Sequence, residues 1–170
     1  MSESDTARIV VRLEPARILI GPHGTMLRAR EFFEAGLYLQ NNADRFSPVG
    51  GFLTCRAIEL ALKAYLFARD ISRRHVRRLG HDLTRLFIEA EVRGLAHYVQ
   101  FAPGDIAVVI QTGRDYSEHR LAYFDVAWVV GGGFEPSPAI LERVATALLA
   151  ALEPVCRDAA MGDGDPLPLR

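Results

Sequence analysis

An arginine followed by a histidine is the first candidate for chemistry in this sequence. Arg114 precedes a polar residue, Asp115, then three further residues and His119. A histidine can take the proton from a ribose 2′-hydroxyl, while an arginine can donate two parallel hydrogen bonds to the charge that develops on the phosphate. The pair would therefore suit metal-independent cleavage of single-stranded RNA. The alternative is an ordinary surface or loop pair, because 19 arginines and 5 histidines produce this spacing by chance more than once.

A cluster of arginines is the second candidate, for binding rather than catalysis. Its members fall within 17 residues and are Arg69, Arg73, Arg74, Arg77, Arg78 and Arg85. In a helix, Arg73 would lie beside Arg77, and Arg74 beside Arg78, which gives two ridges of positive charge that could contact a phosphate backbone. Because the net charge is −1, any contact with nucleic acid would have to come from such a local patch. The alternative is a solvated helix end whose arginines favour the negative end of the helix dipole.

Other reactive residue types give weaker signals. His81 and Asp82 stand where a helix is expected to begin, so a hydrogen-bonded turn histidine and a capping aspartate explain them. The sequence has no Cys-x-x-Cys or His-x-x-x-His spacing, so we expect no metal site. The triple glycine at 131–133 lacks the residues of a phosphate-binding loop and is interpreted as a linker, so we expect no cofactor.

Composition indicates a cytoplasmic protein of one domain. A chain of 170 residues that is 49% hydrophobic can bury a core. Its 2 cysteines do not make a disulfide framework, and the polar N-terminus lacks the pattern of a signal peptide. The most apolar stretch, residues 49–67, contains Arg56, Glu59 and Lys63, which argues against a membrane span. The excess of arginine over lysine is typical of a GC-rich bacterial genome.

Hydrophobic periodicity predicts two helices in the first half of the chain. A helix capped by Thr25 is expected to run to about residue 44, and Pro48 suits the first turn before an apolar helix over 52–67. The second helix is apolar almost all round, so it must lie at a bundle centre or in a subunit interface. Glu59 and Lys63 are expected to pair along its exposed strip, a contribution of about 0.2–0.5 kcal/mol.

Later elements are predicted from their end signals. A helix over 83–92 follows Asp82, and a last helix begins after Ser137 and ends near residue 155. Residues 105–111 and 121–130 are apolar, but periodicity does not distinguish helix from strand there. The sequence thus predicts a mainly α fold with a short extended arm or short strands over 1–25 and a disordered tail over 158–170.

Two linked motifs resemble a known family. The first, Glu59-Leu60-x-Leu62-Lys63-Ala64-x-Leu66, lies in the apolar helix, and the second, Gly80-His81-Asp82-Leu83, follows it. Together they resemble the HEPN family (higher eukaryote and prokaryote nucleotide-binding), in the subgroup with a Gly-His-Asp-Leu turn. The resemblance runs from about residue 26 to 155 and is strongest over 52–95. It implies a HEPN-like bundle of four or five helices over 26–157, and usually a homodimer.

Two functions follow from the resemblance and the candidate residues. One is an RNA- or protein-binding module, in a bacterial defence or toxin–antitoxin context with an antitoxin or another protein as partner. The other is a metal-independent endoribonuclease, which the resemblance implies for members that carry the Arg and His motif, here Arg114 and His119. Geometry separates them, because catalysis requires both side chains to converge in a groove that RNA can enter.

Overall fold

The structure is a computed structural model that describes residues 21–42, 48–121 and 137–162, and the regular elements of these ranges are all helical. The α-helices are α1 (Pro22–Asn42), α2 (Pro48–Ala68), α3 (Arg73–Leu79), α4 (Leu83–Val92), α5 (Asp105–Ser117) and α7 (Pro138–Gly162), and a 3-10 turn, η1, covers Leu95–His97. The predicted mainly α class is confirmed. The described ranges hold more helices than the four or five expected, because the arginine-rich segment forms the short helix α3.

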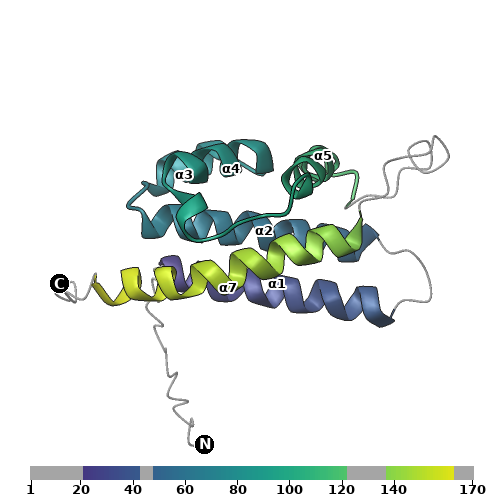
Figure 1. Ribbon diagram of the computed structural model, residues 1–170, viewed down its shortest axis with the longest axis horizontal. Coiled ribbons are helices and arrows are strands. Elements are labelled where there is room, and N and C mark those ends of the chain that lie inside the picture. Colours follow the sequence, from purple (N-terminus) through teal and green to yellow (C-terminus); the bar gives the residue numbers. More distant parts are fainter. Residues whose placement is uncertain (1–20, 43–47, 122–136, 163–170) are drawn as a thin grey trace, which may run out of the picture.

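Helix α2 occupies the middle of the bundle. Figure 1 shows it between the long helices α1 and α7 on one side and the shorter α3, α4 and α5 on the other. Ile58, Leu62 and Tyr65 of α2 have no exposed surface. This placement explains why the helix is apolar almost all round, because neighbours from the same chain cover most of its faces. A second subunit is not needed to cover α2, and the homodimer stays a prediction.

Residues between α3 and α4 form a tight turn. Asp82 caps α4 as predicted, since its Oδ1 accepts a hydrogen bond from the backbone N–H of Arg85 at 3.1 Å. Gly80 ends α3 with a φ of +64°, in the left-handed region that favours glycine. These two local signals fix the position of His81 between the two helices.

Two helix ends differ from the sequence prediction. Helix α1 begins at Pro22, so Thr25 does not cap it but lies in its first turn, where Oγ1 donates to the carbonyl of Gly21 at 2.9 Å. Pro22 makes a favourable start because its missing N–H would have no partner there in any case. At the other end, α7 continues past Pro154 to Gly162. Residues 158–162, expected in a disordered tail, are therefore helical.

Residues 105–111, which periodicity left open, are helical and belong to α5. Several predictions lie outside the described residues: the arm over 1–20, most of the second ambiguous stretch, the triple glycine at 131–133 and the tail over 163–170. A search of the described helices finds none with the length and apolar character needed to cross a membrane.

Candidate functional site

The carboxylate of Glu59, in the middle of α2, is the centre of a polar network inside the bundle. Its side chain is fully buried, and Oε1 accepts hydrogen bonds from Lys63 Nζ and Arg56 Nη1, each at 2.6 Å. Oε2 accepts a hydrogen bond from the hydroxyl of Tyr116 on α5 and lies 3.0 Å from Nδ1 of His81. The predicted pairing of Glu59 with Lys63 is confirmed. Its placement on an exposed strip is wrong, because side chains from α5 and from the turn before α4 cover the carboxylate.

Hydrogen bonds keep this buried carboxylate ionised. Burial alone would raise the pKa of Glu59, but the hydrogen bonds from Lys63 and Tyr116, together with the charge of Lys63, outweigh burial and hold the pKa below its ordinary value. Burial, followed by the charge of Glu59, raises the pKa of Tyr116, so the phenol remains a hydrogen-bond donor. The network therefore has a fixed negative charge at its centre.

A small cavity opens beside this network, and we call it the polar pocket. It has a volume of about 130 Å³ and is lined by Phe52, Arg56, His81, Tyr116 and His119. The ring centroids of His81 and His119 are 6.4 Å apart, and those of His81 and Tyr116 are 6.3 Å apart. The side chain of His81 is 52% exposed, so the pocket reaches solvent.

A left-handed backbone conformation places His119 in the polar pocket. Helix α5 ends at Ser117, and His119 follows with a φ of +61°, in the region where glycine is the usual residue. Its N–H donates to the carbonyl of Tyr116 at 3.1 Å, and the N–H of Arg120 donates to the carbonyl of Asp115 at 2.8 Å. These two bonds close the helix end in the Schellman pattern. The chain thus accepts backbone strain to hold an imidazole where glycine would be unstrained.

Arg114, the other member of the predicted pair, is exposed on the last turn of α5 and does not belong to the residues that line the polar pocket. The arginine that lines the pocket with His119 is Arg56 of α2. The pairing of Arg114 with His119 stays a prediction. Sequence reasoning missed Arg56 as a site residue, although one signal was present. The most apolar helix contains three charged residues, Arg56, Glu59 and Lys63. A buried charge needs a partner, and a partner from a distant segment of the chain brings several polar side chains together.

Helix α3 presents its arginines to solvent. Arg73, Arg74, Arg77 and Arg78, the four predicted contact residues, are all exposed. In the part of the chain that the structure describes, no carboxylate lies within ion-pair distance of Arg74, Arg77 or Arg78. Arg78 instead contacts Nδ1 of His75 at 3.2 Å. The backbone carbonyl of Arg78 accepts a hydrogen bond from Arg85.

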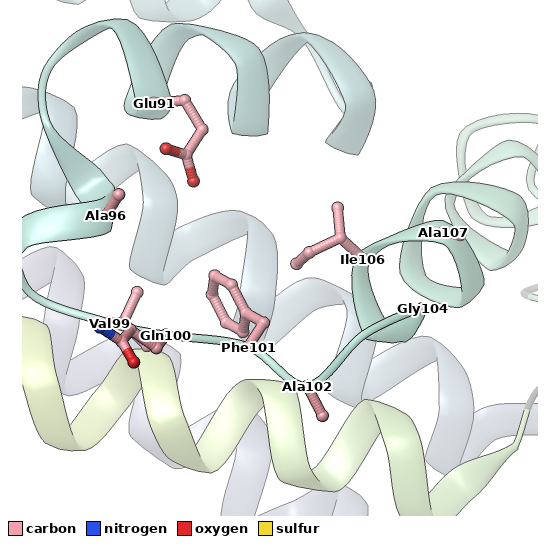
Figure 2. Close-up of a pocket in the computed structure, with 9 residues that line it drawn as sticks. All are labelled: Glu91, Ala96, Val99, Gln100, Phe101, Ala102, Gly104, Ile106 and Ala107. Carbon is pink, nitrogen blue, oxygen red and sulfur yellow. The ribbon is translucent and has the colours of Figure 1, made fainter.

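A second cavity, which we call the apolar groove, lies between the end of α4 and the start of α5. Its volume is about 490 Å³, and its lining includes Glu91, Val99, Phe101, Gly104 and Ile106. Figure 2 shows the side chains of Phe101 and Ile106 directed into the groove, with Glu91 as the one charged side chain that it labels. The groove therefore combines apolar side chains with some polar surface.

Comparison of this chain with protein-family models, with curated proteins and with solved structures finds no match. The HEPN resemblance therefore rests on the motifs of α2 and of the turn before α4.

Proposed function

We propose that this chain is an RNA-binding module in which α3 contacts the RNA backbone. The observation that carries the proposal is the gathering of four exposed arginines on a helix of 7 residues, of which Arg74, Arg77 and Arg78 have no carboxylate partner among the described residues. Guanidinium groups without carboxylate partners form a local positive patch, and phosphate oxygens are acceptors that match their paired N–H groups.

Some arginines elsewhere in the bundle join two helices. Arg143 of α7 binds both carboxylate oxygens of Asp105, with Nε to Oδ2 at 2.9 Å and Nη2 to Oδ1 at 2.6 Å, and so joins α7 to α5. Arg30 of α1 pairs with Glu153 of α7. Among the residues that the structure describes, Arg74, Arg77 and Arg78 have no carboxylate partner on another helix. The alternative interpretation of the α3 arginines is a solvated helix end whose charges only complement the helix dipole.

The first test removes the positive charge of α3. Replacing Arg73, Arg74, Arg77 and Arg78 with Gln should weaken binding of single-stranded RNA and flatten its salt dependence by up to about 0.7 log units per lost contact. Fluorescence anisotropy over a series of salt concentrations measures both quantities. The loss should be the same for RNAs of different sequence, because phosphate contacts position the RNA but do not read its bases.

A matched control separates the α3 patch from total charge. The double variant Arg74→Gln/Arg77→Gln is compared with Arg28→Gln/Arg157→Gln, which removes two exposed arginines from α1 and α7. Only the α3 variant should lose affinity and salt dependence. Unchanged binding in the α3 variant, or equal losses in both, would return the cluster to its interpretation as a solvated helix end.

A metal-independent endoribonuclease is the second candidate, because His119 lines a pocket that reaches solvent and holds an arginine. The His119→Ala variant should lose cleavage of single-stranded RNA while it keeps RNA binding, since the histidine serves the transition state. EDTA should have no effect, and RNA with 2′-deoxy substitutions should resist cleavage. Wild-type protein that leaves varied RNAs intact would refute this candidate and leave the binding module.

We also propose a homodimer, and a protein partner such as an antitoxin, by analogy with the family that the motifs resemble. Light scattering at micromolar concentration tests the dimer. We expect a mass of twice 18.8 kDa, and a mass of 18.8 kDa would refute it.

A further inference from the structure

The polar pocket contains a second histidine that the Arg114 and His119 motif does not use. His81 reaches the pocket from the turn between α3 and α4, and His119 reaches it from the end of α5. The cavity of about 130 Å³ has room for several water molecules or for a phosphate group. Arg56 lines the same cavity.

We propose that the polar pocket cleaves RNA with His81 as general base, His119 as general acid and Arg56 as the phosphate-binding residue. This inference rests on the proposed function, because the RNA reaches the pocket along α3. Arg78, the last arginine of α3, precedes His81 by three residues. Their Cα atoms therefore lie within about 11 Å of each other, so one strand can contact both.

The hydrogen bond to Glu59 sets which ring nitrogen of His81 is free to accept a proton. Nδ1 of His81 lies 3.0 Å from Oε2 of Glu59, and donation from Nδ1 to this carboxylate leaves a lone pair on Nε2. Nη1 of Arg56 lies farther from the same nitrogen, at 3.3 Å, and already donates to Glu59 at 2.6 Å. The carboxylate is thus the better partner of Nδ1, and Nε2 can accept a proton. Glu59 acts as a positioning residue here, since its carboxylate holds His81 and the residue does not line the pocket.

The reaction needs no co-reactant. Nε2 of His81 takes the proton of the 2′-hydroxyl while that oxygen forms a bond to phosphorus, and the bond from phosphorus to the 5′-oxygen breaks. Protonated His119 gives its proton to the leaving 5′-oxygen. The products are a 2′,3′-cyclic phosphate and a 5′-hydroxyl, and the two histidines have exchanged protonation states. Guanidinium N–H groups of Arg56 that Glu59 does not bind donate to the nonbridging oxygens, where charge accumulates.

A substrate with a sulfur atom in place of the scissile 5′-oxygen distinguishes the two histidines. A thiolate leaves without protonation, because a thiol is far more acidic than an alcohol. On ordinary RNA, His81→Asn and His119→Asn should each slow cleavage by about 100-fold or more. On the sulfur substrate, His119→Asn should recover to within about tenfold of wild type, while His81→Asn should stay slow.

Controls keep the outcomes distinct. Asparagine is chosen because it tolerates the left-handed conformation at position 119. His97 is an exposed histidine outside the pocket, so the His97→Asn control should cut both substrates like wild type. Arg56→Gln should slow cleavage and Arg114→Gln should not. The inference is overturned if wild type cuts no RNA, if the sulfur substrate rescues both histidine variants or neither, or if Arg114→Gln is the slower arginine variant.

Binding is measured separately on RNA with a 2′-deoxy residue at the scissile position. Loss of this binding in the α3 quadruple variant, with no cleavage by wild type, would leave the RNA-binding proposal intact and refute the catalytic pocket. Cleavage that depends on His81 and His119, in a protein whose affinity is unchanged by the α3 substitutions, would instead refute the role of α3.

Discussion

The polar pocket and the apolar groove are held together by different forces. The groove is the larger cavity, at about 490 Å³ against about 130 Å³, and its side chains are positioned by packing. Phe101, for example, lies against Phe87 with ring centroids 5.9 Å apart and the rings nearly perpendicular. The pocket is positioned by hydrogen bonds to one buried carboxylate, that of Glu59. The two cavities therefore differ in size and in what holds their side chains in place, and the smaller one gathers the convergent polar groups that chemistry requires.

This difference predicts how each cavity responds to mutation. Trimming one apolar side chain lowers the free energy of unfolding according to the number of atoms removed. Removing the central charge of a buried ionic network leaves its partner charges buried without a counter-charge, which costs more per atom removed. Equivalent changes in the two cavities should therefore have unequal effects on stability.

Loss of the central carboxylate should have the largest effect on stability. Glu59→Ala leaves Arg56 and Lys63 without their partner inside the bundle, and removing one member of a buried ion pair costs about 3–5 kcal/mol. Because the partners keep some exposure, at 28% and 15%, we expect a loss of about 3 kcal/mol in the free energy of unfolding. Urea denaturation measures it. The equivalent change in the groove, Glu91→Ala, removes an exposed carboxylate and should stay within about 0.5 kcal/mol.

Equal stability of the Glu59→Ala and Glu91→Ala variants would contradict this difference between the two cavities. That result would mean that Arg56 and Lys63 find water or other acceptors without cost, and that the network is not what positions the polar pocket.

Removing one hydroxyl from the network should have a smaller effect. Tyr116→Phe deletes the donor to Glu59 and keeps the ring that lies 5.4 Å from the ring of Phe52. A hydrogen bond to a charged group contributes about 1.5–3 kcal/mol, and we expect a loss near 1.5 kcal/mol in urea denaturation. The control is Tyr98→Phe, which removes a hydroxyl from a residue that is 40% exposed and should change stability by less than about 0.5 kcal/mol. Similar losses in both variants would contradict the special position of Tyr116.

Local signals explain which parts of this fold could be predicted from the sequence. Asp82 was identified as a cap because its carboxylate acts on a backbone N–H three residues away, a contact that needs no knowledge of the rest of the chain. Thr25 has the same type of signal, but the prediction that it caps α1 is wrong because the helix begins earlier, at Pro22. The mainly α class followed from periodicity, which is also a local property.

The site depends on contacts that no local signal contains. Tyr116 meets Glu59 across 57 residues of sequence, and that contact decides that Glu59 is buried and not on an exposed strip. The spacing of Glu59 and Lys63 predicted their pairing, but only the packing of α5 over α2 shows which side of α2 is covered. The meeting of His81 with His119 depends on the same packing.

The ionised carboxylate makes stability depend on pH. The pKa of Glu59 is lower in the folded protein than its ordinary value, so its stabilising contribution is fully present above the unfolded pKa of about 4.3 and is lost as the pH falls through the folded pKa. The difference in free energy of unfolding between wild type and Glu59→Gln should therefore shrink as the pH is lowered from 7 to below about 4. Urea denaturation at a series of pH values measures it, and a difference that does not change with pH would contradict the prediction.

The smallest effect concerns two left-handed positions, one in each cavity. Gly104, which lines the apolar groove, has a φ of +86°, and His119 in the polar pocket has a φ of +61°. Glycine adopts this conformation without strain in the groove, whereas histidine adopts it with strain in the pocket. Replacing each residue by the other kind should change the free energy of unfolding in opposite directions. His119→Gly should raise the free energy of unfolding by up to about 1 kcal/mol, and Gly104→Ala should lower it by about 1 kcal/mol.

Thermal and urea denaturation of the two variants measure these changes, with His119→Ala as the control that removes the imidazole and keeps the strained backbone. A gain in stability for His119→Gly but not for His119→Ala would locate the cost in the backbone. It would also mean that the chain keeps a less stable residue at a position that faces His81, which favours a role for the side chain in the pocket. If glycine at position 119 destabilised the protein instead, the imidazole would be a structural contact, and the polar pocket would resemble the apolar groove in being held by packing.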